Sequence, residues 1–394
     1  MLVEHRAFLP IYKIGSWSDG RPIQAQPWKS GHSWPRQIGT SEASFSSKDS
    51  KLDHNLQFHL RSSLMILAGD LGGTKCTLIL FDIDAHRLRP IFRLTAKTAD
   101  FPDIESFFDH FRKHAQSEGH SLTKLTAAGF GVAGAIVNDA VVCNNLPWTI
   151  TRKRIADSLE ITPRRTLLLN DVEAASSSLD HLEPKDLLEL NPGTPQPRAP
   201  KVYVAAGTGL GESILFWNGD RYQVSACEAG LTDFAPASDR EIVVLQYLRQ
   251  RMPLVCTEEV VSGRGFRAIH EAIFPEHHHP FFDDSDIDSA ASITQQAFSK
   301  NCPACQETLH MWTQAYGSEA GNMALRALPF GGVYVGGGIA LKILAKLKDG
   351  TFVRAFCNKT KLADELARIP IFVVLNQDAP VLGAAYAAFA SMEK

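Results

Sequence analysis

Two stretches decide the fold of this chain: LAGDLGGTKCTLILFD at Leu67–Asp82 and VYVAAGTGLGESILFWNG at Val202–Gly219. Each contains an apolar run, a turn of small residues with a Gly-Thr step, and a second apolar run. Glycines in such a turn expose backbone N–H groups that can bind an anion, and the threonine adds a hydroxyl donor. Two such turns predict two halves that grip one polyphosphate from opposite sides. We therefore expect a phosphoryl-transfer enzyme with a duplicated core.

The composition of the chain narrows its class. Its 394 residues leave room for two or three domains, and a hydrophobic content of 44% is enough for sizeable cores. The net charge of −3 offers no basic surface for nucleic acid. The apolar runs are too short to span a bilayer, and seven scattered cysteines are typical of reduced cytosolic thiols. We expect a cytoplasmic protein that binds neither nucleic acid nor membrane.

The first 64 residues differ from the rest of the chain. Residues 1–64 are rich in Ser, His, Trp and Pro and show no sustained helical or strand period, whereas Met65 begins a clean buried strand. Two interpretations stay open. One is a disordered extension with an address or regulatory role, and the other is translation that naturally begins at Met65.

Beyond Met65 the chain alternates predicted strands and helices, which indicates α/β layers. The spacing of apolar residues predicts helices over 104–118 and 263–273 and a strand over 166–169. Pro184 to Pro200 holds five prolines and one glycine, which predicts an exposed loop or hinge.

Two aspartates stand at the ends of predicted strands, where ligands of open α/β sheets collect. Asp70 precedes the first Gly-Thr turn and can hold Mg²⁺ directly or through water; the alternative is a turn aspartate bonded to its own backbone. Asp171 can accept the proton of an attacking hydroxyl; the alternative is an Asx helix cap. Asn170 beside it can hydrogen-bond a sugar hydroxyl.

Two glutamates and a glycine triplet are weaker signals. Carboxylates accept paired hydrogen bonds from vicinal hydroxyls, so Glu228 and Glu258 suit a polyol site, although each alone is more often a surface residue. Gly336-Gly337-Gly338 opens a predicted helix after a strand, which is the geometry of a nucleotide site at a helix N-terminus.

Two further patterns predict no site. Cys302-Pro-Ala-Cys305 has CxxC spacing, but it has no second pair and no nearby histidine to close a zinc site. His277-His278-His279 lies among acids and is interpreted as a solvated surface run. The Rossmann and Walker A patterns are not matched.

Eight segments carry a family resemblance: LAGDLGGTK, FGVAGAIVNDAVVCNNLPW, LLNDVEA, AAGTGLGES, EAGLTDFAP, EEVVSGRG, VYVGGGIA and NQDAPVLGAAYAAF. Their order and spacing resemble the bacterial glucokinase family, within the actin-like sugar-kinase ATPase superfamily. The resemblance implies a two-lobed, ribonuclease H-like α/β fold with a duplicated core and an interlobe cleft. It implies a small lobe of residues 65–171, joined by a C-terminal helix at about 379–394, and a large lobe of residues 172–378. The implied reaction is ATP-dependent phosphorylation of glucose to glucose 6-phosphate, the first step of glycolysis.

The resemblance also implies roles for individual residues. Asn170 and Asp171 resemble the sugar-binding asparagine and the catalytic base, Glu228 and Glu258 the sugar-binding glutamates, and Asn145 a sugar-cleft residue. The implied cofactors are ATP and Mg²⁺, with Asp70 as the metal-binding residue, and the implied assembly is a homodimer. The implied nucleotide-binding residues are Asp70, Gly72, Gly73, Thr74, Lys75, Thr208, Gly209, Gly336, Gly337 and Gly338.

One position departs from the family pattern. The family's EGGHxDFAP reads EAGLTDFAP here, so Leu231 stands where a histidine contacts the sugar. A hydroxyl buried against leucine would lose a partner, at a cost of about 1–3 kcal/mol. Two alternatives stay open: a kinase for another hexose or amino sugar, and a non-catalytic sugar-binding regulator.

Overall fold

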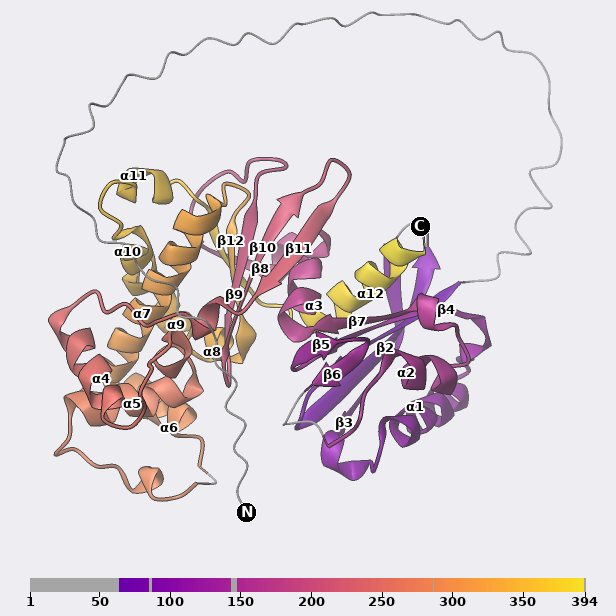
Figure 1. The fold of residues 1–394 in the computed structure, drawn as a ribbon, viewed down its shortest axis with the longest axis horizontal. Helices are drawn as coiled ribbons and strands as arrows, with labels where there is room; N and C mark the ends of the chain where they lie inside the picture. The colour runs from indigo at the N-terminus through magenta and orange to yellow at the C-terminus, as the bar shows by residue number, and fades with distance from the viewer. Residues whose placement is uncertain (1–63, 85–86, 143–146, 286, 393–394) are drawn as a thin grey trace, which may run out of the picture. The chain divides into compact units, whose positions relative to one another are not determined.

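The described residues of this computed structural model are 64–84, 87–142, 147–285 and 287–392, so the extension predicted over 1–64 lies outside them apart from Leu64. They form two larger mixed β-sheets (Figure 1). The first has the strand order β3 (Arg87–Lys97), β2 (Lys75–Asp84), β1 (Met65–Leu71), β4 (Leu125–Val132), β7 (Thr166–Asn170). The second has the order β11 (Tyr222–Cys227), β10 (Leu210–Trp217), β9 (Lys201–Ala206), β12 (Val333–Gly336), β13 (Ile371–Val374), β8 (Leu187–Asn191). A separate hairpin consists of β5 (Ala135–Val137) and β6 (Ala140–Val142).

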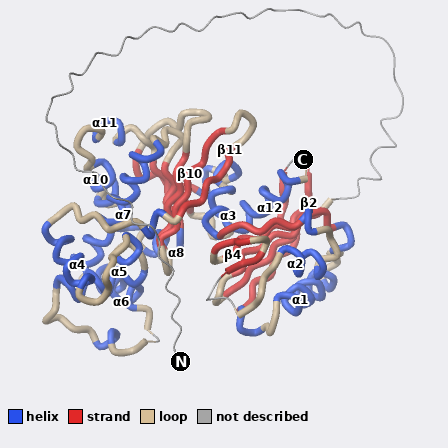
Figure 2. Tube along the Cα trace, viewed as in Figure 1, coloured by secondary structure: helices blue, strands red, loops and turns tan. Residues whose placement is uncertain are grey.

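The two sheets, red in Figure 2, repeat one pairing pattern. β1 pairs antiparallel with β2 and parallel with β4, and β9 pairs antiparallel with β10 and parallel with β12. β3 then extends β2 as β11 extends β10, and β7 extends β4 as β13 extends β12. Each Gly-Thr turn joins equivalent strands, β1 to β2 and β9 to β10. The predicted α/β fold with a duplicated core is therefore confirmed.

The strand β8 has no counterpart in the first sheet, and it contradicts a prediction. The sequence predicts a loop or hinge over Pro184–Pro200, whereas Leu187–Asn191 forms an edge strand antiparallel to β13. The prolines of the segment all lie outside this strand, so none of them removes a ladder hydrogen bond. Because the partner strand is far along the chain, no local pattern reports the pairing.

The helices match the predicted ranges closely where the apolar spacing is regular. The predicted helices over 104–118 and 263–273 correspond to α1 and α5. Among the described residues, no helix is long and apolar enough to cross a membrane. The helices are α1 (Ile104–Ser117), α2 (Arg152–Ser158), α3 (Asp171–Ser177), α4 (Asp239–Arg249), α5 (Gly263–Ile273), α6 (Ser289–Phe298), α7 (Pro303–Ala327), α8 (Gly337–Lys342), α9 (Leu344–Leu347), α10 (Thr351–Cys357), α11 (Ala363–Leu366) and α12 (Ala379–Ser391).

Alternate side chains of the first sheet enter two separate cores. Leu78 of β2 packs in a cluster with Phe107 of α1, whereas its neighbour Ile79 packs in a cluster with Ala384 of α12. This alternation follows from the period of two along a strand. The first sheet is therefore covered by α1 on one face and by α12 on the other.

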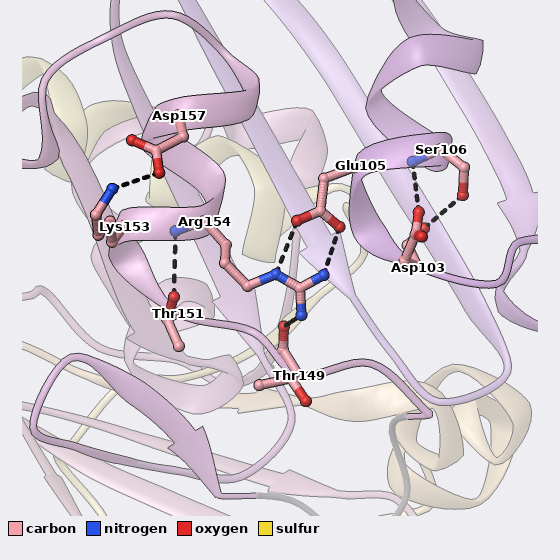
Figure 3. A network of polar contacts seen from close by, with 8 residues as sticks. All are labelled: Asp103, Glu105, Ser106, Thr149, Thr151, Lys153, Arg154 and Asp157. Carbon is pink, nitrogen blue, oxygen red and sulfur yellow. Dashed lines mark hydrogen bonds and ion pairs between the residues drawn. The ribbon is translucent and has the colours of Figure 1, made fainter.

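An ion pair joins the two helices α1 and α2 (Figure 3). Arg154 of α2 donates from Nε and Nη2 to the two carboxylate oxygens of Glu105 on α1, both at 2.7 Å. Its third nitrogen, Nη1, donates to the carbonyl of Thr149 at 2.7 Å. A bidentate pair of this kind fixes orientation as well as distance, so it sets how α2 lies against α1.

The short helix α3 packs against the cores of both larger sheets. Ala174 belongs to the cluster formed by the first sheet and α12, and Ala175 belongs to a cluster that includes Tyr203 of β9. The hydroxyls of Ser176 and Ser213 form a 2.6 Å hydrogen bond between α3 and β10. The first residue of α3, Asp171, is therefore held by an element that contacts both halves of the duplicated core.

A buried carboxyl on β10 gives the protein an expected pH dependence. Glu212 is fully buried, and neither of its carboxylate oxygens has a hydrogen-bond partner among the described residues. Burial, followed by the negative charge of Glu319, raises the pKa of Glu212 from 4.5 to about 8. Because the folded pKa lies above the unfolded one, this group stabilises the fold below pH 4.5, and that stability is lost as the pH rises towards 8.

We therefore expect Glu212→Gln to raise the free energy of unfolding at pH 8 by roughly 2–5 kcal/mol and to change it little at pH 5. Urea denaturation across this pH range measures the difference. Glu189→Gln, an exposed change on the edge strand β8, is the matched control and should leave the pH profile as it is. Parallel profiles for Glu212→Gln and the wild type would contradict the assignment.

Candidate functional site

The first Gly-Thr turn is a short hairpin between β1 and β2, and hydrogen bonds from Thr98 hold it in place. The amide of Gly72 donates to the carbonyl of Lys75 at 3.2 Å. Thr98 donates from its hydroxyl to the carbonyl of Gly72 at 2.7 Å and from its amide to the carbonyl of Thr74 at 3.0 Å. Thr74 and Lys75 at the tip are exposed. The turn thus presents a hydroxyl and an ammonium group to a ligand.

The second Gly-Thr turn is packed against Glu258. The carbonyl of Gly207 accepts from the amide of Gly263 at 2.9 Å, which ties the turn to the start of α5. Oε2 of Glu258 accepts from the amide of Leu210 at 2.9 Å, and a Cβ placed on Gly209 would lie only 2.5 Å from that oxygen. A larger residue at this position would therefore displace the carboxylate of Glu258.

Two loops lie side by side near this second turn. The amide of Thr257 donates to the carbonyl of Thr232 at 2.9 Å, and the amide of Phe234 donates to the carbonyl of Val255 at 2.9 Å. These bonds place the EAGLTDF segment, which carries Glu228, alongside the segment that carries Glu258. Two glutamates that are separate in the sequence thus come from adjacent loops.

Glu258 is already bonded in this structure. Its second oxygen, Oε1, accepts from Arg264, and Arg264 also lies 3.0 Å from Glu259. Glu228, by contrast, is exposed. Leu231 lies in the 3₁₀ turn Ala229–Leu231 with 57% of its surface exposed, so no core holds this leucine in place. Asn145, the other predicted sugar-site residue, lies outside the described residues.

The start of α3 separates two roles that the sequence leaves open. The amide of Val172 donates to Oδ1 of Asn170 at 2.8 Å and to Oδ1 of Asp171 at 2.9 Å. Asn170 is the N-cap residue, and its Nδ2 donates to the carbonyl of Gly134 at 3.3 Å. Asn170 is thus the N-cap residue and shares this amide with Oδ1 of Asp171, whereas Oδ2 of Asp171 makes no hydrogen bond to another of the described residues.

The electrostatics link Asp171 to Asp70 at the end of β1. Burial first, and then the charge of Asp171, raises the pKa of Asp70 to about 6, although Lys75 acts in the opposite direction. Burial also raises the pKa of Asp171, with a further contribution from Glu228, while the amide of Val172 opposes the rise. These carboxyls therefore form one electrostatically coupled group, as expected where a cation or a reacting proton is handled.

A third aspartate belongs to this group and was missed by the sequence analysis. Asp378 directly precedes α12, and its charge also raises the pKa of Asp70. Its Oδ1 lies 2.8 Å from a guanidinium nitrogen of Arg93 on β3. The available signal was its position between the last predicted strand and the last predicted helix, equivalent to that of Asp171.

The glycine triplet allows the start of α8 to pack closely on β9. A Cβ on Gly336 would lie 2.0 Å from the hydroxyl oxygen of Tyr203. Gly337 has a φ of +84°, and a Cβ there would lie 2.4 Å from the carbonyl oxygen of Ala206. Around Gly338, a Cβ would meet nothing within 4 Å. Two of the glycines are thus needed for packing, and the third borders open space.

That space is a pocket of about 390 Å³ that runs from the second Gly-Thr turn to the glycine triplet. Lys342 of α8 lies 3.5 Å from Asp288, and both line the pocket. A mainly apolar pocket with a few polar groups suits a nucleoside. Of the predicted nucleotide-binding residues, Thr208 and Gly338 meet in it, whereas the first turn does not line it. The lining residues are Gly207, Thr208, Gly263, Arg264, Phe266, Asp288, Ala290, Ala291, Thr294, Gly338, Ile339, Lys342 and Ile343.

Comparison with known proteins shows which family this chain is similar to. A family model described as Glucokinase matches residues 67–391. The glucokinase of Nostoc sp. (strain PCC 7120) is 35% identical over 343 residues, which cover 82% of this chain and 98% of that protein.

Solved structures agree in fold. A glucokinase from an Antarctic psychrotroph has a TM-score of 0.72 at 24% identity, covering 83% of this chain and 99% of that one. A ROK family glucokinase from Streptomyces griseus, in complex with glucose and AMPPNP, has a TM-score of 0.55 at 19% identity, with coverage of 83% and 99%. At these identities the solved structures establish the fold alone.

Proposed function

Because this chain belongs to the glucokinase family, we infer that it transfers the γ-phosphoryl group of ATP to the 6-hydroxyl of glucose, with Asp171 as the general base. The observation that carries the role of Asp171 is the geometry at the start of α3. Asn170 caps the helix there, which leaves Oδ2 of Asp171 to accept the proton of a sugar hydroxyl. A carboxylate in this position activates the hydroxyl for attack on the phosphoryl group.

ATP is proposed to bind with its nucleoside in the pocket of Thr208 and Gly338 and its phosphates towards the two Gly-Thr turns. The exposed Thr74 and Lys75 of the first turn supply donors of the kind that bind phosphate oxygens. Gly209, Gly336 and Gly337 contribute by letting the surrounding segments approach closely. The remaining proposed contacts of the first turn are Asp70, Gly72 and Gly73.

The residues present also fit a magnesium ion. Burial, together with the charges of Asp171 and Asp378, raises the pKa of Asp70 to about 6, so a cation bound here would relieve the repulsion. Carboxylate oxygens are suitable ligands for Mg²⁺. Asp70 is proposed to hold the ion directly or through water, and the ion would neutralise charge on the transferred phosphate.

The sugar is proposed to bind through Asn170, Asp171, Glu228 and Glu258. Asn170 keeps one amide hydrogen for a ligand after its bond to Gly134. The bond between Glu258 and Arg264 would have to open or be shared with a sugar hydroxyl. The family assignment favours glucose over another hexose or an amino sugar, and catalysis over a regulatory role. The sugar role of Asn145 stays a prediction.

Several broader expectations remain proposals. They are a small lobe of residues 65–171 joined by the C-terminal helix, a large lobe of residues 172–378, and a cleft between them. A cytoplasmic location, a role in glycolysis and a homodimer are likewise predictions.

Release of ADP by the purified protein with glucose, and not without it, tests the reaction itself. Absence of glucose-dependent turnover would overturn the proposed function.

Leu231→His is expected to lower the KM for glucose by about 5–150-fold, because the imidazole restores a hydrogen-bond donor worth about 1–3 kcal/mol. Because Leu231 is exposed, the polar imidazole ring is accommodated at this position without loss of core packing. Steady-state kinetics with glucose and a panel of other hexoses measure the change.

Leu254→His is the matched control, since Leu254 is 78% exposed and lies outside the proposed sugar contacts. An unchanged KM for glucose in Leu231→His would show that position 231 does not face the sugar.

A further inference from the structure

A cluster of cysteine and histidine side chains lies outside the proposed active site. Cys302 and Cys305 stand at the start of α7, and His279 lies on the connection between α5 and α6. Nε2 of His279 lies 3.1 Å from Sγ of Cys305 and 3.6 Å from Sγ of Cys302. The sequence analysis found no histidine near enough to close a metal site, and this is wrong. The histidine comes from before α6 and the cysteines from after it, so their spacing in the sequence is not a standard zinc pattern.

The distances fit the ligands of a tetrahedral zinc ion. Bond lengths of about 2.3 Å to sulfur and 2.0–2.1 Å to nitrogen place two such ligand atoms about 3.6 Å apart. The two sulfur–nitrogen separations, 3.1 and 3.6 Å, lie at or slightly below this value. One ligand atom from each of the three residues lies within 4.8 Å of the others. Closure around a metal ion therefore needs side-chain shifts of only a few tenths of an ångström to about one.

The two sulfur atoms are buried and held in place. Cys302 is 5% exposed and Cys305 is fully buried. Cys302 is the N-cap of α7, and its Sγ accepts from the amide of Cys305 at 3.2 Å. The thiolate is the form that binds a metal.

Neighbouring histidines hold the loop that carries His279. His270, His277 and His279 also have ligand atoms within 4.8 Å of one another. Buried His270 uses Nδ1 for a 3.0 Å contact with the hydroxyl of Thr308 and Nε2 for a 3.0 Å contact with the carbonyl of His277. Both of its nitrogens are thus engaged, and it positions the loop. His277 is exposed, so its imidazole is accessible.

We propose that Cys302, Cys305 and His279 bind a zinc ion, with a water molecule in the fourth position. Two thiolates and an imidazole are a donor set that selects zinc over hard cations such as Mg²⁺. The ion fastens residues 274–285 of the α5–α6 connection to the start of α7. That connection ends at Asp288, which lines the pocket proposed for the nucleoside. If the pocket binds ATP, as the proposed function states, the metal therefore also orders one wall of the ATP site.

Metal analysis of the purified protein tests the site directly. Protein expressed with added zinc and then dialysed should carry about one zinc ion per chain by plasma mass spectrometry. His279→Ala and the double variant Cys302→Ser/Cys305→Ser should lose it. His278→Ala is the matched control, because His278 is exposed and its Nε2 pairs with Asp283 instead, 2.9 Å away; it should retain the metal. A zinc-free wild type, or zinc retained by the double variant, would overturn the proposal.

A second measurement does not depend on whether the variants fold. Cobalt-substituted wild type should show the near-ultraviolet absorption of a thiolate–cobalt bond. A disulfide between Cys302 and Cys305 in metal-free wild type, found by mass spectrometry after thiol alkylation, would instead mark a redox pair and refute the metal site.

The link to the nucleotide pocket has its own readout. Removing zinc with a selective chelator should lower the thermal midpoint of unfolding and raise the KM for ATP more than that for glucose. Equal changes in both KM values would refute the link to the ATP site. Zinc content and the thermal midpoint decide the metal site even if the protein does not phosphorylate glucose, so the two proposals fail separately.

Discussion

Asp171→Asn is expected to lower kcat by about 10²–10⁴-fold with a modest change in the KM for glucose. Asparagine retains an oxygen that can accept from the amide of Val172, so the start of α3 should keep its geometry. It cannot take the proton of the sugar hydroxyl, so the loss falls on turnover. Coupled measurement of ADP release at saturating glucose gives kcat directly.

Glu173→Gln is the control for this substitution, because it makes the same chemical change in the same turn of α3 at a residue with no proposed role. Its kcat should stay close to that of the wild type. Near-full turnover in Asp171→Asn would show that another group acts as the base.

The wild-type activity should also fall as the pH decreases towards and below about 6. Burial raises the pKa of Asp171, and the pKa of Asp70 is raised to about 6. Asp171 must be ionised to act as a base and Asp70 to hold a cation, so protonation of either removes activity. A profile of kcat/KM that stays flat down to pH 4 would contradict both roles.

Gly383→Ala is expected to destabilise the protein by about 3 kcal/mol or more. A Cβ on Gly383 would lie 1.8 Å from the carbonyl oxygen of Ala174 and 2.7 Å from the amide nitrogen of Ser178. Both neighbours are backbone atoms, so α12 and α3 must move apart to admit a methyl group. Because α3 packs against both larger sheets, this displacement disturbs two cores at once.

Urea denaturation measures the effect, with Gly338→Ala as the control. A Cβ on Gly338 meets nothing within 4 Å, so that helical position should tolerate alanine within about 0.5 kcal/mol. Equal stability of the two variants would show that the α3–α12 contact adjusts freely.

Local patterns account for the parts of the fold that the sequence predicted correctly. Each Gly-Thr turn joins strands that are adjacent in the chain, and the apolar spacing that predicts helix 263–273 lies within that helix. The strand β8 was missed because its pairing with β13 depends on a distant segment. The same reason explains why the cysteine and histidine cluster was missed. His279 contacts Cys302 and Cys305 in space, but the whole of α6 separates them in the sequence.

In the candidate site, too, some features follow from local sequence patterns and others do not. Thr208 and Gly338, both in glycine-rich segments that the sequence singled out, line one pocket. The capping role of Asn170 and the contact of Glu258 with the second turn depend on side-chain geometry. The spacing of residues along the sequence does not reveal this geometry. Asp378 was missed because its relation to Asp70 is electrostatic and spans nearly the whole described chain.

The contact of α12 with the first sheet has a consequence for biosynthesis. Ile66 and Ala68 of β1 share a core with Ala384 and Ala388 of α12. About 250 residues separate the end of β4 from α12, which at ~5–20 residues per second corresponds to roughly 12–50 s of translation. During this time the face that α12 later covers stays without its partner on the ribosome. The nascent chain should therefore depend on chaperones until its last helix emerges.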